Sequence, residues 1–272
     1  MPNLLINNEV DLPVIFNGGL ILLQPLESVY ELNAHATNIV ENYFEQNIFD
    51  ITTNEFTNLS EFVDKAKACK STFSNDSKTH TLLRQLILER YKKYSKESLL
   101  FDVPRLRIVP NSLFLSSGIS YNYKPHRDTW YGGDEDQVNH WMNLANASAD
   151  ATFYISPNYF FRSVSNNSEI FDLDEWVSKY RPLAEKSVQT EARPHPIPLE
   201  EISESDQYKI VMPPGFEVVF SGHHLHGSAP NTTESVRFSI DYRVCVKTQE
   251  YSFPKNIDNR ATGVYKNSML KV

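Results

Sequence analysis

The sequence predicts one mainly β domain with flanking α-helices, its core being a sandwich, a barrel or a jelly roll. Two observations carry this prediction. Apolar residues recur at three- and four-residue steps before Pro104, and short β-branched or aromatic segments separated by proline, glycine and asparagine follow it. A chain of 272 residues is long enough to bury one sizeable core. We therefore expect a single domain over 1–272, with a mostly helical buttress over 1–103, a β core over 104–250 and a tail over 251–272.

Three helices are expected in the N-terminal part. Short apolar runs broken by proline and a glycine pair first indicate one or two strands and turns over 1–24. Apolar residues at helical spacing then run over 25–46. Thr57 or Asn58 can cap a second helix, and a third begins near Asp76. The predicted order is helices first, packed on the outside of a double-sheeted β core.

Six segments are predicted to be strands: Arg105–Val109, Val138–Leu144, Ala151–Ile155, Tyr208–Met212, Phe216–Ser221 and Val236–Val246. A helix over 173–183 interrupts them, because its apolar residues repeat at helical spacing. The residues after this helix are polar and rich in proline. We therefore interpret 157–206 as an insertion between strands, long enough to form an active-site lid.

Charge and composition exclude several classes of function. The chain carries 26 basic and 34 acidic side chains, a formal net charge of −8. It lacks the clustered lysine and arginine that contacts to nucleic-acid phosphates require. No apolar stretch reaches the ~20 residues of a membrane span, and no signal segment is recognisable at the N-terminus. We expect a cytoplasmic protein with no nucleic-acid or membrane partner, in which Cys69 and Cys245 are free, buried thiols.

Two stretches about a hundred residues apart carry metal-ligating side chains. His126 and Asp128 are two residues apart, so on an extended strand both point to the same face. His226 would join them from a second strand, with His223 and His224 as competitors. Two imidazoles and one carboxylate on one face of an octahedral ion leave three positions open, which is the ligand set of non-haem iron(II) oxygenases. Three other histidines are expected to be surface or packing residues: His80, His140 and His195.

An arginine downstream of the second histidine completes the pattern. Along 236–246, Arg237 shares a strand face with Ser239, Asp241 and Arg243. An arginine fork beside a hydroxyl can hold the distal carboxylate of 2-oxoglutarate by paired charge-assisted hydrogen bonds. Arg243 is a rival anchor on the same face.

Three elements of this pattern resemble the phytanoyl-CoA dioxygenase-like branch of the Fe(II)/2-oxoglutarate oxygenases: His126-x-Asp128, the run His226-Gly227-Ser228-x-x-Asn231, and Arg237 eleven positions after His226. The match covers roughly 120–145 and 210–245, and the rest of the chain agrees only in general character. Asn231 is expected to organise the turn between the last two strands. The resemblance implies a double-stranded β-helix, a jelly roll of the cupin type, with helices buttressing its larger sheet.

The same resemblance implies the cofactors and the residues that hold them. His126, Asp128 and His226 are then the ligands of Fe(II), Arg237 binds the C5 carboxylate of 2-oxoglutarate, and dioxygen is the second co-substrate. The implied reaction hydroxylates an unactivated C–H bond of a small molecule and decarboxylates 2-oxoglutarate to succinate. We expect a specialised metabolite such as an alkaloid, or an amino-acid derivative. The acidic composition favours a substrate with amine or guanidine character.

Several alternatives stay open at the level of sequence. Halogenases of the superfamily lack the carboxylate ligand, so Asp128 favours hydroxylation, whereas desaturation, cyclisation and epoxidation use the same oxidant. A non-catalytic metal-binding cupin is another alternative, although a structural metal site needs no carboxylate anchor such as Arg237. An isomerase or a metal-dependent lyase on the same barrel is a third. The oligomeric state is also open, a homo-oligomer included.

Other side chains near the ligands are candidates for contacts to the co-substrate or substrate. Four can donate a hydrogen bond to 2-oxoglutarate: Ser239, Asn139, Thr129 and Tyr123. Four aromatic residues are either ordinary core or walls of the substrate pocket: Tyr123, Trp130, Tyr131 and Trp141. Arg127 points away from the metal on a regular strand, which predicts a structural salt bridge.

Overall fold

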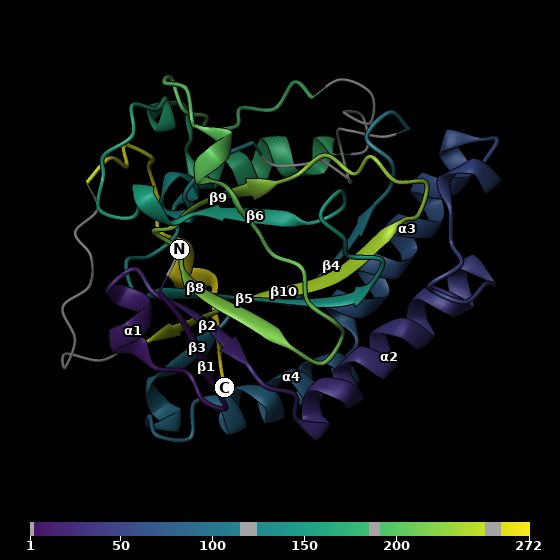
Figure 1. Cartoon of the computed structure of the whole chain (residues 1–272), viewed down its shortest axis with the longest axis horizontal. Helices are drawn as coiled ribbons and strands as arrows, with labels where there is room; N and C mark the ends of the chain where they lie inside the picture. Colours follow the sequence, from purple (N-terminus) through teal and green to yellow (C-terminus); the bar gives the residue numbers. More distant parts are fainter. Residues whose placement is uncertain (1–2, 115–123, 185–190, 248–256) are drawn as a thin grey trace.

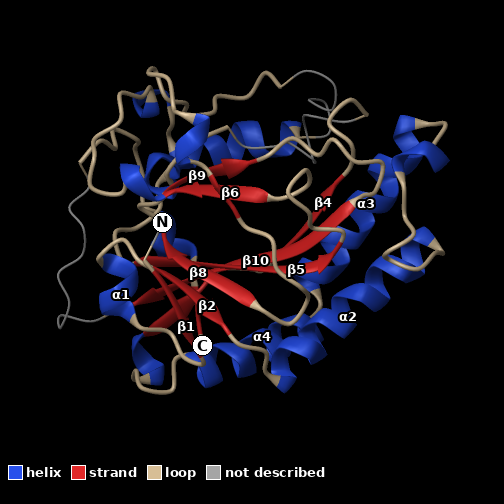
Figure 2. Ribbon diagram, viewed as in Figure 1, coloured by secondary structure: helices blue, strands red, loops and turns tan. Residues whose placement is uncertain are grey.

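The computed structural model describes residues 3–114, 124–184, 191–247 and 257–272. Two β-sheets face each other, and helices pack behind the larger one (Figure 1, Figure 2). The larger sheet has the strand order β1-β2-β8-β5-β10-β3-β11, with β4 also paired to β10, and the smaller sheet has the order β7-β6-β9. This is a jelly-roll core with flanking helices, so the predicted fold class is confirmed.

The strands of the larger sheet are β1 Leu4–Asn7, β2 Leu20–Leu23, β3 Leu99–Phe101, β4 Arg105–Val109, β5 Gln137–Ala145, β8 Glu217–Ser221, β10 Arg237–Val246 and β11 Leu270–Lys271. Those of the smaller sheet are β6 Phe153–Ser156, β7 Tyr208–Lys209 and β9 Leu225–Ser228. Each of the six predicted segments overlaps a strand. The strands β3 and β11 were not predicted, and β9 was expected only as a strand that carries His226, without bounds, because segments of two to four residues are too short to display a period.

Four helices belong to the N-terminal part: α1 Leu12–Phe16, α2 Glu27–Phe44, α3 Leu59–Asn75 and α4 Ser77–Arg90. The side chains of Asn58 and Asp76 accept hydrogen bonds from backbone N–H groups of the first turns of α3 and α4. This confirms Asn58, one of two predicted candidates, as the cap of α3, and it confirms the predicted start of a helix near Asp76. The short helix α1 is a departure from the strands and turns expected over 1–24. Its Leu12, Ile15 and Phe16 are buried, so packing rather than periodicity holds this single turn.

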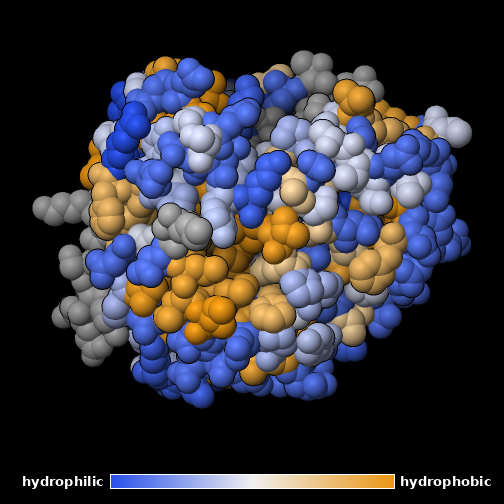
Figure 3. Space-filling model, in the orientation of Figure 1, coloured by the Kyte–Doolittle hydropathy of each residue, from blue (hydrophilic) through white to orange (hydrophobic). Residues whose placement is uncertain are grey.

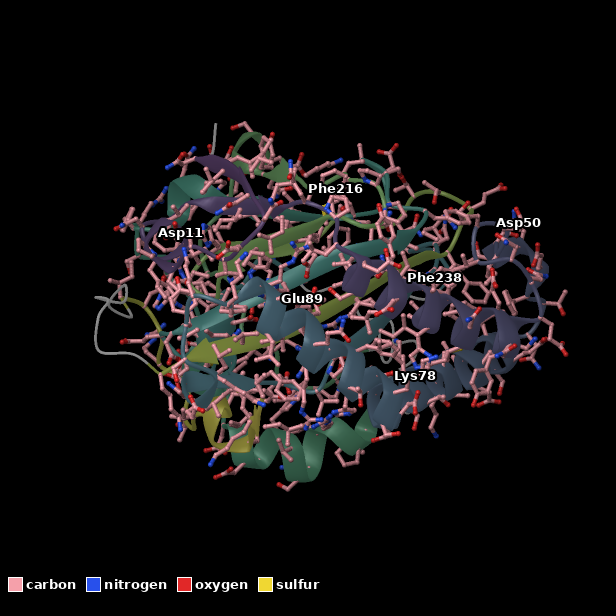
Figure 4. The ribbon with its side chains drawn as sticks, turned by 90° about the horizontal axis from the view of Figure 1, so that it is seen from below. Asp11, Asp50, Lys78, Glu89, Phe216 and Phe238 are labelled. Atoms are coloured by element: carbon pink, nitrogen blue, oxygen red, sulfur yellow. The ribbon has the colours of Figure 1, made fainter. Side chains whose placement is uncertain are left out.

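Side chains of the larger sheet alternate between two environments. On β10, Phe238, Ile240 and Tyr242 point to the helices and belong to the main hydrophobic core. The intervening residues of the same strand, beginning with Arg237 and Ser239, point to the smaller sheet. Helices α2 and α4 lie across the outer face of the larger sheet (Figure 4). The residues of β10 that face the smaller sheet therefore bring polar side chains into the space between the two sheets.

One buried ion pair ties the helices to the larger sheet. Arg90, at the end of α4, donates from Nε to Oε2 of Glu217 on β8 at 2.6 Å, and both side chains are fully buried. The same guanidinium donates to the backbone carbonyls of Asn8 and Gln24, next to β1 and β2. Tyr242 of β10 donates to Oε1 of Glu217. This network joins α4, both N-terminal strands and the sheet at one point.

The segment expected to be an insertion contains the other main helical element. Helix α5 Leu173–Glu175 continues as a π-helix over Trp176–Tyr180 and a 3-10 turn over Arg181–Leu183. This agrees with the helix predicted over 173–183. The remaining 3-10 turns are short and lie at Thr53–Glu55, Lys96–Ser98, Asp128–Tyr131, Pro157–Tyr159, Ser168–Ile170, Glu204–Asp206 and Tyr265–Ser268.

The surface and the cysteines complete the description. Apolar side chains gather on the face that carries the edge strand β1, where Leu4, Leu5 and Ile6 are exposed (Figure 3). Among the described helices, none combines the length and apolar character needed to cross a bilayer. Cys69 and Cys245 are both free and buried, as predicted.

Candidate metal centre

A cavity of about 290 Å³ lies between the two sheets, and three metal-ligating side chains meet in its wall. Ligand atoms of His126, Asp128 and His226 all lie within 4.8 Å of one another. Oδ1 of Asp128 is 3.7 Å from Nε2 of His126 and 3.9 Å from Nε2 of His226. The structure thus brings together the two halves of the sequence pattern, and the three donor atoms face a common space.

The three residues are held differently from the regular strand that the sequence suggested. His126 forms an isolated antiparallel bridge with His226 of β9, through backbone hydrogen bonds of 2.8 and 2.9 Å. Asp128 begins a 3-10 turn, and its N–H donates to the carbonyl of Gly222. A Cβ at Gly133 would lie 2.7 Å from the backbone oxygen of Asp128, so this turn requires glycine there. His126 and Asp128 still point to the same side, as predicted, although they lie in a bridge and a turn rather than on a regular strand.

Both imidazoles present the same nitrogen to the cavity. Nδ1 of His126 lies 2.8 Å from the carbonyl of Lys124, and Nδ1 of His226 lies 2.9 Å from that of His224. A carbonyl can only accept, so Nδ1 carries the proton and Nε2 keeps its lone pair. Burial, followed by the nearby His226, lowers the pKa of His126 to about 3, and burial also lowers the pKa of His226. Both rings are therefore neutral near pH 7, the form that binds a metal.

The carboxylate of Asp128 has one oxygen fully engaged by the protein. Gln137 and Asn139 of β5 donate to Oδ2 at 2.6 and 2.7 Å. Oδ1 is left facing the two imidazoles, with Nη2 of Arg243 at 3.4 Å. Burial alone would raise the pKa of Asp128, but Arg243, the imidazoles and Asn139 hold it well below its usual range. The arrangement offers a metal a single, charged carboxylate oxygen.

A second charged group lines the same cavity and makes no ion pair with the residues that the structure describes. Arg237, at the start of β10, is 3% exposed, and neither its Nε nor its Nη1 has a hydrogen-bond partner among the described residues. The Oγ of Ser239, two residues along the same face, is buried and equally unpartnered in the described part of the chain. The guanidinium lies 6.0 Å from the ring centroid of Trp141. Burial, then Arg107, lowers the pKa of Arg237 to about 10, so the side chain stays charged at neutral pH.

Of the other candidates from the sequence, some line the cavity and others do not. Tyr131 and Trp141 line the cavity, and the ring of Tyr131 contacts that of His126 with centroids 5.2 Å apart. Asn139 also lines it, but its amide is engaged by Asp128 rather than free to meet a ligand. Thr129 is buried inside the turn and is not among the described residues that line the cavity.

The remaining candidates lie elsewhere. The indole of Trp130 packs in a separate core and donates from Nε1 to Asp258 at 2.8 Å, so it does not reach the cavity. Arg127 makes the predicted structural salt bridge, with its Nε 3.0 Å from Oδ2 of the same Asp258. Tyr123 lies outside the described residues. Asn231 organises the turn between β9 and β10, because its side chain bonds the backbones of Val109, Thr233 and Ser235.

The competing histidines are engaged elsewhere in the fold. The imidazole of His224 lies between the carbonyls of Ser221 and Gly18 and packs on Phe160. His223 is buried beside Arg127, whose guanidinium donates to its carbonyl. His140 was not a competitor but an expected surface or packing residue, and it stacks on Tyr242 on the helix side of the sheet. None of these three belongs to the metal-type cluster found in the described residues.

Sequence reasoning missed the residues that hold the metal-type cluster and much of the cavity wall. Gln137 precedes Asn139 by two positions on one strand, so their shared parity was the available signal for a joint role. Arg243 was considered only as a rival anchor for 2-oxoglutarate, whereas it lies beside Asp128. Arg105 and Arg107 of β4 also line the cavity, and no local sequence pattern predicts this position for them.

Comparisons with known proteins give the same fold. No model of a protein family and no curated protein sequence matches the chain. Among solved structures, the apo form of the non-heme monooxygenase ThoJ superposes with a TM-score of 0.52 at 14% identity, covering 94% of this chain and 88% of that chain. The chain therefore has the fold of a non-heme oxygenase, with a two-histidine, one-carboxylate cluster in the cavity between its sheets.

Two further structures are similar at lower scores. EvdO2 from Micromonospora carbonacea var. aurantiaca, complexed with 2-oxoglutarate, has a TM-score of 0.47 at 13% identity and covers 91% of this chain and 95% of that chain. EctD from S. alaskensis, with 2-oxoglutarate and 5-hydroxyectoine, has a TM-score of 0.48 at 12% identity and covers 90% and 78%. The fold assignment rests on ThoJ, and the phytanoyl-CoA dioxygenase-like branch stays a prediction.

Proposed function

We propose that this chain is an Fe(II)- and 2-oxoglutarate-dependent oxygenase that hydroxylates a small molecule. The observation that carries the proposal is the buried Arg237, a cation with no ion pair among the described residues, in the same cavity as the His126, Asp128 and His226 cluster. A buried, unpaired charge is costly unless a ligand supplies the opposite charge. The pairing of a metal-type cluster with an anion-type anchor is the signature of a metal that chelates an anionic co-substrate.

The donor set suits iron(II). Two ligand atoms at adjacent positions of an octahedral ion lie about 3 Å apart when the bonds are about 2.1 Å. The separations of 3.7 and 3.9 Å between Asp128 and the two imidazoles need only a small closure to reach that value. Two neutral imidazoles and one carboxylate are the ligands of non-haem iron(II) oxygenases. Because Gln137 and Asn139 occupy Oδ2, Asp128 would bind through Oδ1 alone and leave three positions for other ligands.

The charges and donors also suit 2-oxoglutarate. One end of this dianion chelates a metal through a carboxylate and a keto oxygen, and the other end is a free carboxylate. Arg237, which lines the cavity, can donate from two nitrogens to that distal carboxylate. The unpartnered hydroxyl of Ser239 follows on the same strand face but is not among the described lining residues. The charges of iron(II), Asp128, 2-oxoglutarate and Arg237 sum to zero. Binding would therefore balance the charges of these four groups.

The chemistry follows from the bound groups and the walls around them. When bound, iron(II) with 2-oxoglutarate and dioxygen supplies an oxidant that converts a substrate C–H to C–OH, while 2-oxoglutarate becomes succinate and carbon dioxide. Asp128 occupies the position that halogenases leave for chloride, which favours hydroxylation. Tyr131 and Trp141 wall the cavity and limit the access of water. A cavity of about 290 Å³ suits a small molecule rather than a polymer segment.

Anaerobic addition of 2-oxoglutarate to the iron(II)-loaded protein tests the proposal. We expect a weak visible charge-transfer band that saturates with 2-oxoglutarate. His126→Ala and Asp128→Ala should abolish the band. The control His80→Ala replaces a histidine that does not line the cavity, so it should leave the band unchanged. Absence of the band in protein shown to contain iron would overturn the proposal. Tight iron binding without 2-oxoglutarate binding would instead support a non-catalytic metal-binding protein.

A further inference from the structure

A helical stripe forms the part of the cavity wall opposite the larger sheet. It consists of Leu173, Trp176, Val177, Arg181 and Ala184, at helical spacing along α5 and the turns that follow it. The stripe contains a π-helix over Trp176–Tyr180, a feature frequent at functional sites. Four of its five members are apolar or aromatic, and Arg181 is the exception. A charged residue among apolar ones on a cavity wall requires an explanation.

The arginines of the cavity differ in their partners. Four are paired with carboxylates: Arg105 with Asp102 at 2.5 Å, Arg107 with Asp241 at 3.0 Å, Arg193 with Glu191 at 2.5 Å and Arg243 with Asp128 at 3.4 Å. Arg237 has no such partner, and the proposed function assigns it to 2-oxoglutarate. Arg181 also has no ion pair with any residue in the described part of the chain. It is exposed at the mouth of the cavity.

A surplus of positive charge remains after the metal and co-substrate are counted. Iron(II), Asp128, 2-oxoglutarate and Arg237 balance one another. Among the described residues, five arginines then remain in the cavity wall, against the three carboxylates Asp102, Asp241 and Glu191 that pair with them. Within this part of the chain the surplus is two positive charges. A cleft lined by one sign of charge concentrates ligands of the opposite sign, even in a protein whose net charge is −8.

The wall beside Arg181 is suited to a flat or apolar molecular body. The indole of Trp176 lies 5.4 Å from the ring of Phe171 and 5.0 Å from that of His195, measured between centroids. The guanidinium of Arg193 covers Trp176 at 5.4 Å from its centroid. Tyr131 contacts Phe171 and extends this wall to His126. An aromatic surface thus runs from Arg181 towards the metal-type cluster.

We propose that the substrate is an anion, with a carboxylate or phosphate group received by Arg181 and an apolar or flat body lying on Trp176. The proposal rests on the function proposed above and specifies its substrate class. It is opposite to the expectation, taken from the acidic composition, of a substrate with amine character. Net charge sums over the whole surface, whereas a substrate meets only the cavity wall. Arg181 would act by binding the substrate and orienting its reacting carbon toward the metal.

Matched aromatic probes test this assignment. The probes are 1-naphthoate, 1-naphthyl phosphate and the neutral 1-naphthamide, titrated by calorimetry into protein with Mn(II) and saturating 2-oxoglutarate. We expect at least one anion to bind more tightly than the amide. Arg181→Gln should reduce that preference about tenfold, and Arg181→Lys should retain part of it. Lys179→Ala is the matched control, because Lys179 lies on the same helix, pairs with Glu175 and does not line the cavity.

The outcomes separate this proposal from the function on which it rests. Equal binding of anions and amide to the wild-type protein, or no binding of either anion, would overturn the substrate class. An equal loss in Lys179→Ala and Arg181→Gln would also overturn it, because the effect would then be one of general charge. If 2-oxoglutarate itself does not bind, the proposed function fails. In that case the role of Arg181 can still be measured. The affinity for 1-naphthoate is compared between metal-free Arg237→Ala protein and the same protein that also carries Arg181→Gln. Preference for the phosphate over the carboxylate, or the reverse, identifies the anionic group.

Discussion

Asn139 Nδ2 lies 2.7 Å from Oδ2 of Asp128, and this contact determines which carboxylate oxygen remains for a metal. Gln137 donates to the same oxygen at 2.6 Å and to Oδ1 of Asn139 at 2.8 Å. The two amides therefore form one unit on β5 that orients Asp128. Such supporting contacts commonly matter almost as much to metal affinity as the ligands themselves.

We predict that Asn139→Ala lowers the affinity for Fe(II) or Mn(II) by about 10- to 100-fold. The carboxylate of Asp128 would lose a donor and gain freedom to rotate. Asn143→Ala is the matched control, because Asn143 lies on the same strand face and donates instead to the carbonyl of Met212. Metal titration followed by calorimetry measures both variants. Equal metal affinity in Asn139→Ala and the wild type would show that the contact does not position Asp128.

Arg237→Ala should weaken 2-oxoglutarate binding by about tenfold to a hundredfold, because hydrogen bonds to charged groups are each worth about 1.5–3 kcal/mol. Metal affinity should change little, since Arg237 is not among the three clustered donors. Saturation of the visible band, or the KM for 2-oxoglutarate, provides the measurement. Arg237→Lys keeps the charge and loses the fork, so an intermediate affinity is expected. A loss of metal binding equal to the loss of 2-oxoglutarate binding would contradict this role.

Glu217→Gln should lower the free energy of unfolding by about 3–5 kcal/mol, because it leaves the fully buried Arg90 without its counter-ion. The change preserves shape, so the effect reports charge rather than volume. Chemical denaturation monitored by circular dichroism measures it. Glu200→Gln is a suitable control, because its partner Arg162 is largely exposed. Similar losses of unfolding free energy in the two variants would show that the buried Arg90 pair stabilises the fold no more than an exposed pair does.

The carboxylate of Glu217 should also make the stability of the fold depend on pH. Burial alone would raise the pKa of Glu217, but the neighbouring His140, Arg90 and Tyr242 lower it to about 2. A carboxylate whose pKa is depressed in the folded state stabilises the fold above its unfolded pKa of about 4.3 and loses that effect as the pH falls towards the folded value. The difference in stability between wild type and Glu217→Gln should therefore narrow below about pH 4. Denaturation midpoints across pH 2.5–7 provide the measurement, and a constant difference would contradict the prediction.

Local signals were sufficient for helices α2, α3 and α4, but not for α1. Asn58 caps α3 as expected, and α4 starts at its expected place after Asp76, because a cap depends on one side chain and the backbone of the next turn. The strand β4 was predicted at its observed bounds, since its pattern of alternating residues is local as well. Strand β9 was expected only as the strand that carries His226, and its bounds were not predicted, because its Leu-His-Gly-Ser sequence has no β character of its own. It becomes a strand by pairing with β6.

The site, like the fold, was predictable where it depends on local sequence and not where it depends on contacts between distant segments. The spacing from His126 to Asp128 and from His226 to Arg237 selected the residues that the structure gathers around one cavity. The geometry was less predictable. His126 meets His226 through a bridge between segments a hundred residues apart, and Trp130, adjacent to Tyr131, turns into a different core. A 3-10 turn rather than a strand decides which neighbours of Asp128 face the cavity.

By itself, the sequence predicted the fold class and the order of the longer helices and strands, and with the family resemblance it selected the three clustered donors. These depend on periodicity, on local caps and on chemically distinctive side chains. Only the tertiary structure decided which oxygen of Asp128 is free, that Arg237 is buried with no ion pair among the described residues, and that arginines from β4, β10 and the helical stretch 173–184 share one cavity. The physical reason is that pairing and burial of charge depend on contacts between distant segments. No local pattern encodes such contacts, and the net charge of the chain averages over them.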